Sequence, residues 1–197
     1  MKYKELLIIF FSVIFFCYNA FASAFEDKEI FDAVNNEDTS LFLEMMAAGV
    51  DVNEKDAKGN TPLMIAYSYG RYNFAKFIID MGANVNKKNY KGVVALHRAA
   101  ETGNNEIVNL LLDNNAFVDM PDLEGITPLM LAVIAEKQST VELLIKRGAS
   151  VAFRNIKGQT AIDIAKSRRL WNIYSFLTVD RSSDTKLKNE PNYSWDY

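Results

Sequence analysis

The chain has 197 residues, of which 49% are hydrophobic and 24% are charged, and its formal net charge is −3. This balance excludes a disordered chain and a polybasic nucleic-acid binder. There is one histidine, His97, and one cysteine, Cys17, so no disulfide can form within the chain. A zinc site or a Ser-His-Asp arrangement would have to be built around His97 alone. We therefore expect no catalytic residue, no metal site and no cofactor.

Residues 1–24 have the pattern of a secretory signal peptide. Lysines within the first five residues precede an apolar run at 6–16, and small residues follow at Ala20, Ala22 and Ala24. We expect cleavage after Ala24, with cleavage after Ala22 as the alternative. An uncleaved membrane anchor is a further alternative, although the apolar run is shorter than the ~20 residues that a spanning helix needs.

The same segment predicts where the protein is found. A short, simple signal and an excess of lysine over arginine, 15 against 7, favour a bacterial protein from an AT-rich genome. Cleavage after Ala24 would also remove Cys17, which suits an oxidising compartment. We therefore expect a periplasmic or secreted protein.

A period of 33 residues organises the rest of the chain. The segment Gly-Asn-Thr-Pro-Leu-Met-Ile-Ala at 59–66 recurs in altered form at 92–99, 125–132 and 158–165. An aspartate or asparagine three residues before each glycine keeps the same step: Asp56, Asn89, Asp122 and Asn155. A later landmark does so too: Gly49, Gly82, Asn115 and Gly148. One period before 63–66, residues 30–33 stand where a first unit is expected.

Each landmark has a mechanical reason. Asp or Asn three residues before Gly favours a tight turn. Thr61 and Thr127 are suited to cap a helix whose first position is a proline. A second helix follows in each unit, and Gly or Asn then ends it in the left-handed conformation. Because no unit can bury its apolar face alone, the units must stack.

These motifs resemble the ankyrin repeat family over residues 26 to about 178. The resemblance implies an all-α repeat solenoid of about five units, each a helix-turn-helix pair, with β-hairpin fingers projecting between units. The pattern departs at Val94 and Ala95, which replace Thr-Pro in the third unit, and at Ala161 in the last. His97 holds the place where family members use histidine for hydrogen bonds between adjacent turns. With Val94 in place of threonine, the bond to that residue's side chain cannot form, and we expect His97 to be structural.

The expected domains follow from the period. A signal peptide at 1–24 precedes an N-terminal capping repeat at 25–58, and further repeats that start near 59, 92, 125 and 158 fill 59–178. Residues 179–197 are polar and lack the period, so we expect a flexible tail. Its aromatic residues could alternatively dock on the end of the array or on a partner: Tyr193, Trp195 and Tyr197.

Charge differs between the two ends of the repeat region. Residues 26–44 carry seven acids and one base, whereas residues 146–169 carry seven bases and one acid. Oriented docking or head-to-tail stacking would use this asymmetry. The alternative is that terminal repeats are simply polar.

The resemblance also implies where a partner binds, because family members use the hairpin tips and the exposed edge of the first helix. Those places carry apolar side chains in the middle units, where solvated tips should be polar. The predicted partner-binding residues are Tyr69, Tyr90, Val93, Leu123, Ile126, Ile134 and Ile156. We expect a non-enzymatic module that binds an unidentified protein, with no nucleic acid and with membrane contact only if the N-terminus stays uncleaved. The alternative is an ankyrin targeting domain of an enzyme-associated or membrane-anchored factor.

Overall fold

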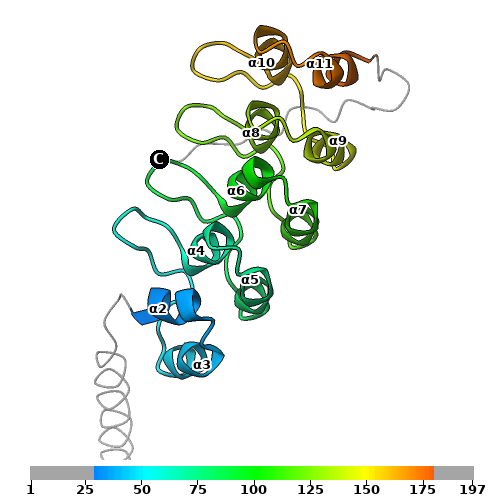
Figure 1. Ribbon diagram of the computed structural model, residues 1–197. Helices are drawn as coiled ribbons and strands as arrows, with labels where there is room; N and C mark the ends of the chain where they lie inside the picture. Colours follow the sequence, from blue (N-terminus) through cyan, green and yellow to red (C-terminus); the bar gives the residue numbers. More distant parts are fainter. Residues whose placement is uncertain (1–28, 180–197) are drawn as a thin grey trace, which may run out of the picture.

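The computed structural model describes residues 29–179, and this part of the chain forms ten α-helices in two parallel rows (Figure 1). The inner row is α2 (Glu29–Asn36), α4 (Pro62–Ser68), α6 (Ala95–Thr102), α8 (Pro128–Ile134) and α10 (Ala161–Ser167). The outer row is α3 (Thr39–Ala47), α5 (Tyr72–Asp80), α7 (Asn105–Asp113), α9 (Gln138–Lys146) and α11 (Trp171–Thr178). Each successive inner and outer pair is one unit, numbered 1 to 5. The predicted all-α repeat solenoid is confirmed, while the predicted signal peptide and residues 180–197 of the tail lie outside the described residues.

The helix boundaries follow the landmarks of the sequence. The Oγ1 atoms of Thr61 and Thr127 accept hydrogen bonds from the backbone N–H of Met64 and Met130, at 3.4 and 3.3 Å. A proline follows each of these threonines at the first helical position. The outer helices of units 1 to 4 end in positive φ at Gly49, Gly82, Asn115 and Gly148. The capping and helix-ending predictions are therefore confirmed.

A second series of left-handed residues joins the inner helix of each unit to the outer helix. It has the same period and consists of Glu37, Gly70, Gly103, Glu136 and Arg169, with φ between 54° and 80°. Only two of these five residues are glycines, so the series carries no glycine signal that sequence reasoning could have followed.

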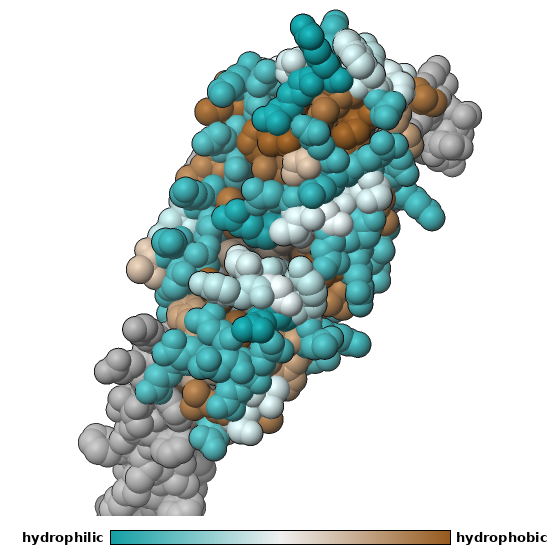
Figure 2. Space-filling model, viewed as in Figure 1, coloured by the Kyte–Doolittle hydropathy of each residue, from teal (hydrophilic) through white to brown (hydrophobic). Residues whose placement is uncertain are grey.

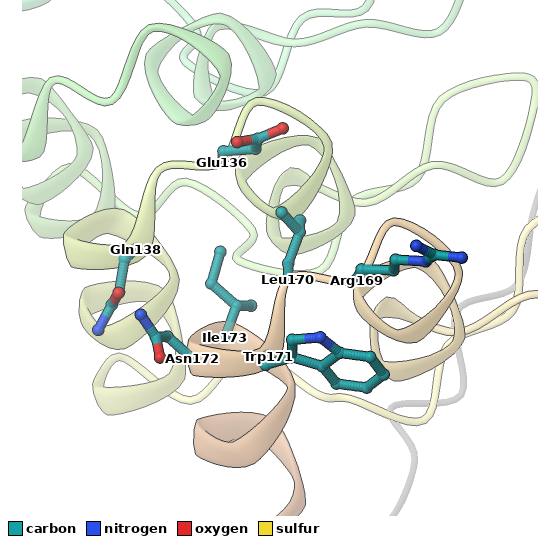
Figure 3. A pocket seen from close by; sticks show the side chains of 7 residues that line it. All are labelled: Glu136, Gln138, Arg169, Leu170, Trp171, Asn172 and Ile173. Carbon is teal, nitrogen blue, oxygen red and sulfur yellow. The ribbon is translucent and has the colours of Figure 1, made fainter.

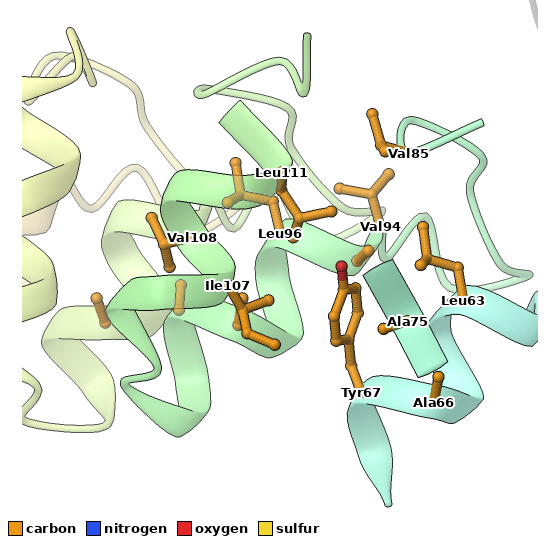
Figure 4. Close-up of a cluster of buried hydrophobic side chains, with 14 of the residues drawn as sticks. Leu63, Ala66, Tyr67, Ala75, Val85, Val94, Leu96, Ile107, Val108 and Leu111 are labelled. Carbon is orange, nitrogen blue, oxygen red and sulfur yellow. The ribbon is translucent and has the colours of Figure 1, made fainter. Parts of the chain in front are cut away.

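The hydrophobic core is continuous through the stack because the units bury one another. Small side chains on the inner helices let neighbouring units approach closely, and all four are at most 2% exposed: Ala66, Ala99, Ala132 and Ala165. Between units 2 and 3, the ring of Tyr67 on α4 extends toward Val94 and the helices of the next unit (Figure 4). Val94, Leu96, Val108 and Leu111 are all fully buried there. A unit taken out of the stack would expose these side chains to water.

Four loops project from the inner row on one side of the molecule (Figure 1). We call them finger 1 (51–60), finger 2 (84–93), finger 3 (117–126) and finger 4 (150–159). In finger 3 the Asp122 carboxylate accepts the N–H groups of Glu124 and Ile126, at 2.9 and 2.8 Å, which fixes the tight turn. The equivalent side chains of the other fingers make the same pair of bonds.

The expectation of β-hairpin fingers is wrong for the described residues, which contain no β-strand. Each turn is closed by a backbone hydrogen bond such as that from Asp122 N–H to the Ile126 carbonyl, 3.0 Å. Adjacent fingers are joined at their tips by one backbone bond, for example Leu123 N–H to the Lys91 carbonyl at 3.1 Å. Single bonds of this kind stack the fingers without building a ladder.

The start of α6 is where the repeat pattern departs, and it gives a stability prediction. Val94 makes no side-chain cap bond, and its extended backbone (φ −110°, ψ 169°) is compatible with a following proline. Thr61 and Thr127 are buried in the same way, so threonine fits there. The double substitution Val94→Thr, Ala95→Pro should raise the free energy of unfolding by about 1 kcal/mol.

Urea unfolding measures this change, and the single variant Ala95→Pro separates the proline from the cap. A lowered midpoint in the double variant would show that the packing of the Val94 methyl groups outweighs the new hydrogen bond.

Candidate functional site

Three apolar side chains stand at equivalent places on consecutive finger tips. Tyr90, Leu123 and Ile156 are 64%, 68% and 71% exposed, and each donates its backbone N–H to the preceding finger. The equivalent residue of finger 1 is Ala57. Large apolar side chains in a row on the surface usually mark an interaction site. We call these three residues the tip ridge.

A groove of about 380 Å³ lies beside the tip ridge, between units 4 and 5. Its apolar lining comes from fingers 3 and 4 and from α8 and α10: Ile126, Leu131, Ile134, Ile156 and Ile164. Its charged lining residues are Asp122, Glu124, Lys157 and Arg168. The Arg168 guanidinium donates to the Ile134 carbonyl at 3.0 Å, which joins the two units across the groove. In the space-filling view, apolar surface gathers toward this end of the array (Figure 2).

The structure does not bring all seven predicted partner-binding residues together. Ile126, Ile134 and Ile156 line the groove, and Tyr90 and Leu123 extend the exposed apolar surface along the tips. Val93 is half-buried in finger 2. Tyr69 is 63% exposed at the end of α4, away from the groove. The groove between units 4 and 5 was not anticipated as a feature, because Leu131 and Ile164 read as ordinary core positions in the sequence.

Comparison with protein families agrees with this geometry. A family model described as ankyrin repeats (3 copies) matches residues 30–122, and a single ankyrin repeat matches residues 124–156. The chain belongs to the ankyrin repeat family. Unit 5 of this ankyrin repeat protein lies almost wholly beyond the matched residues, yet α10 and α11 continue the stack. Comparison with curated protein sequences finds no significant match.

His97 links two adjacent turns by hydrogen bonds, as the ankyrin repeat resemblance implies, but one of its partners was not anticipated from the sequence. Its fully buried ring accepts the backbone N–H of Val94 at Nδ1, 3.2 Å away. The proton therefore sits on Nε2, which donates to the Ile126 carbonyl of finger 3 at 2.9 Å. The missing threonine side chain is thus replaced by a backbone donor. Burial lowers the pKa of His97, so the ring stays neutral, and both nitrogens are engaged in structure.

A third set of periodic bonds holds the bases of the fingers of this ankyrin repeat protein together. The side-chain oxygens of Asn53, Asn86 and Asp119 accept the backbone N–H groups of Asn84, Phe117 and Ser150, at 2.7, 2.9 and 3.0 Å. Only the third acceptor is a carboxylate. Burial raises the pKa of Asp119 to about 6, and the hydrogen bond from Ser150 only partly offsets this effect.

Replacing this carboxylate by the amide of the other two fingers should therefore stabilise the ankyrin repeat array. A pKa that is raised from 3.8 in the unfolded chain to about 6 in the folded state favours folding at low pH, and this contribution is lost as pH rises through 6. We expect Asp119→Asn to raise the free energy of unfolding by about 1–2 kcal/mol at pH 7 and by little at pH 4. Urea unfolding at both pH values checks this. Asn86→Asp is the reciprocal control, and an equal gain at pH 4 and pH 7 would contradict the ionisation argument.

The described residues contain neither a candidate metal site nor a candidate membrane span. Within 29–179, no group of three or more His, Cys, Asp or Glu side chains could hold a metal ion. In the same range, no helix has the length and apolar character needed to cross a bilayer. Ankyrin repeats are in general protein-interaction modules, and the groove and the tip ridge are the surfaces that fit such a role.

Proposed function

We propose that this ankyrin repeat protein is an exported, non-enzymatic module that binds one protein partner with its fingers and concave face. The observation that supports this most strongly is the apolar groove between units 4 and 5, continuous with the exposed tip of finger 4 through Ile156. A monomer gains nothing by exposing Leu123 and Ile156 at the tips, because neither side chain is needed for the turn that carries it.

The residues that line the groove indicate which kind of protein segment it binds. Its aliphatic lining accepts one or two apolar side chains. The acids Asp122 and Glu124 come from finger 3, and the bases Lys157 and Arg168 come from finger 4 and the end of α10, so together they favour a partner that carries both charges. Buried apolar anchors carry most of the free energy of such interfaces, and charges at the edge act mainly on the association rate. The partner is therefore a protein segment with aliphatic or aromatic side chains flanked by both charges.

Substitution of the tip residues tests the proposal. After affinity capture of a partner from the native cell envelope, Leu123→Asp and Ile156→Asp should each weaken its binding by about tenfold or more. The matched control is Ala57→Asp, which places the same charge at the equivalent position of finger 1. Because all three positions are exposed, the urea midpoints should be unchanged. Normal binding by both tip variants would contradict the proposal.

Export is a separate part of the proposal and has its own test. It is supported by the sequence of residues 1–24 alone. N-terminal sequencing of the protein recovered outside the cytoplasm should find Phe25 as the first residue, or Ser23 if cleavage follows Ala22. A start at Met1 would replace the cleaved signal with a membrane anchor and leave the binding surface as proposed.

A further inference from the structure

The outer half of the last unit exposes apolar side chains at two positions that, in unit 3, contact the next unit. In unit 3, Asn105 accepts a hydrogen bond from Thr140 and Asp113 pairs with Arg147, both from unit 4. The equivalents of these two residues in unit 5 are Trp171 and Val179, which are 58% and 61% exposed. Terminal repeats need a polar outer face to stay soluble, and at both positions unit 5 is more apolar than unit 3.

Tyr174 on α11 completes this surface. The equivalents of Tyr174 in units 2, 3 and 4 are Ala75, Val108 and Val141, all fully buried, whereas Tyr174 is only partly buried. Its ring packs edge-on against Trp171, with ring centres 5.9 Å apart. We call Trp171, Tyr174 and Val179 the end face. No described residue stacks beyond it.

A pocket of about 360 Å³ opens at the edge of the end face (Figure 3). It lies between the turn that joins α8 to α9 and the turn that joins α10 to α11, and Trp171, Leu170 and Ile173 give it an apolar wall. Arg169 and Glu136 lie at the same pocket. A volume of this size accommodates an aromatic side chain.

The charge around the end face indicates what covers it. One position of the inner helix is buried in units 2, 3 and 4, where it holds Tyr67, Ala100 and Val133. In unit 5 the same position on α10 holds the exposed Lys166, and Arg169 is exposed as well. Residues 189–197 contain two acids and no base, together with three aromatic side chains, Tyr193, Trp195 and Tyr197. This segment therefore complements the end face in both charge and apolar character.

We propose that the aromatic segment 189–197 folds back and covers the end face of α11, with one aromatic side chain in the pocket beside Trp171. The reach is ample. Trp195 follows Val179 by sixteen residues, which can span up to about 50 Å, whereas a helix of eight residues is about 12 Å long. Tethering also gives the segment an effective concentration on the order of millimolar, which a second copy of the chain does not have at ordinary concentrations.

Hydrogen exchange on the full chain tests this proposal. The variant Tyr193→Ser, Trp195→Ser, Tyr197→Ser removes the three aromatic side chains, and the matched control Asn189→Ser, Asn192→Ser, Ser194→Ala changes the same segment and keeps them. We expect amides of α11 to exchange about tenfold faster in the aromatic variant than in the control, with α7 unchanged as an internal reference.

Fluorescence gives a second readout. The chain has two tryptophans, so Trp171→Phe leaves Trp195 as the only one while keeping the end face aromatic. Its emission should be blue-shifted and protected from acrylamide, and adding Val179→Asp should reverse both effects. Quenching of Trp195 as complete as in urea, with equal α11 exchange in all variants, would overturn the proposal. Protection that disappears on dilution would also overturn it and would assign the face to a second copy.

Discussion

Replacing Gly92 by alanine should lower the free energy of unfolding by about 3 kcal/mol, through a single added methyl group. Gly92 lies in finger 2 with φ +76°, and a Cβ atom there would stand 2.7 Å from the backbone nitrogen of Leu123 and 3.0 Å from the carbonyl carbon of Asp122. Both contacts are backbone atoms of finger 3, which cannot rotate away. The methyl group must therefore push two fingers apart and break the bond from Leu123 N–H to the Lys91 carbonyl.

Gly158→Ala is the matched control for this prediction. It stands at the equivalent place of finger 4 with φ +72°, but nothing lies within 4 Å of a Cβ atom there. Only backbone strain remains, so the cost should be about 1 kcal/mol. The difference between the two variants in urea unfolding measures the contact between fingers. Equal costs would mean that neighbouring fingers do not constrain each other.

The same pair of glycines shows how far sequence reasoning reaches. The 33-residue period predicts that both residues sit in tight turns, because the turn is a local property of the Asp-x-x-Gly pattern. It does not show that Gly92 is in contact with finger 3 while Gly158 is free, since that depends on what stacks next to each finger. The stacking of equivalent fingers was predictable, whereas the missing ladder of strand hydrogen bonds was not.

The candidate site was predictable to a similar degree. The tips at Tyr90, Leu123 and Ile156 follow from their place in the repeat, and the structure exposes all three. The groove between units 4 and 5 depends on aliphatic side chains of two inner helices that face each other across a gap, which no single repeat reveals. Asp119 was missed because an aspartate in a polar loop gives no sign of burial.

His97→Ala should lower the free energy of unfolding by about 3 kcal/mol at pH 7. It leaves a cavity in place of a fully buried ring, and it leaves the Val94 N–H and the Ile126 carbonyl without their hydrogen bonds to that ring. His97→Met should cost less, about 1–2 kcal/mol, because methionine occupies the equivalent places at Met64 and Met130. Urea unfolding at pH 7 gives both values. A His97→Met variant as unstable as His97→Ala would show that the hydrogen bonds matter more than the volume of the ring.

The pH dependence separates the ring's charge from its packing. Burial lowers the pKa of His97 in the folded state, so the unfolded chain binds more protons below its pKa of 6.5. The contribution of neutral His97 is therefore present above pH 6.5 and is lost as pH falls through the lowered folded pKa. Protonation would also give Nδ1 a proton that points at the N–H of Val94.

Asp119 masks this loss in the natural chain, because its folded pKa of about 6 makes stability rise as pH falls over an overlapping range. The measurement therefore belongs in the Asp119→Asn background. There, the free energy of unfolding should fall between pH 7 and pH 5, and adding His97→Met should flatten that fall. In the single variant His97→Met, with Asp119 intact, stability should instead increase toward pH 5. The same slope with and without His97 would mean that other groups set the acid sensitivity of the array.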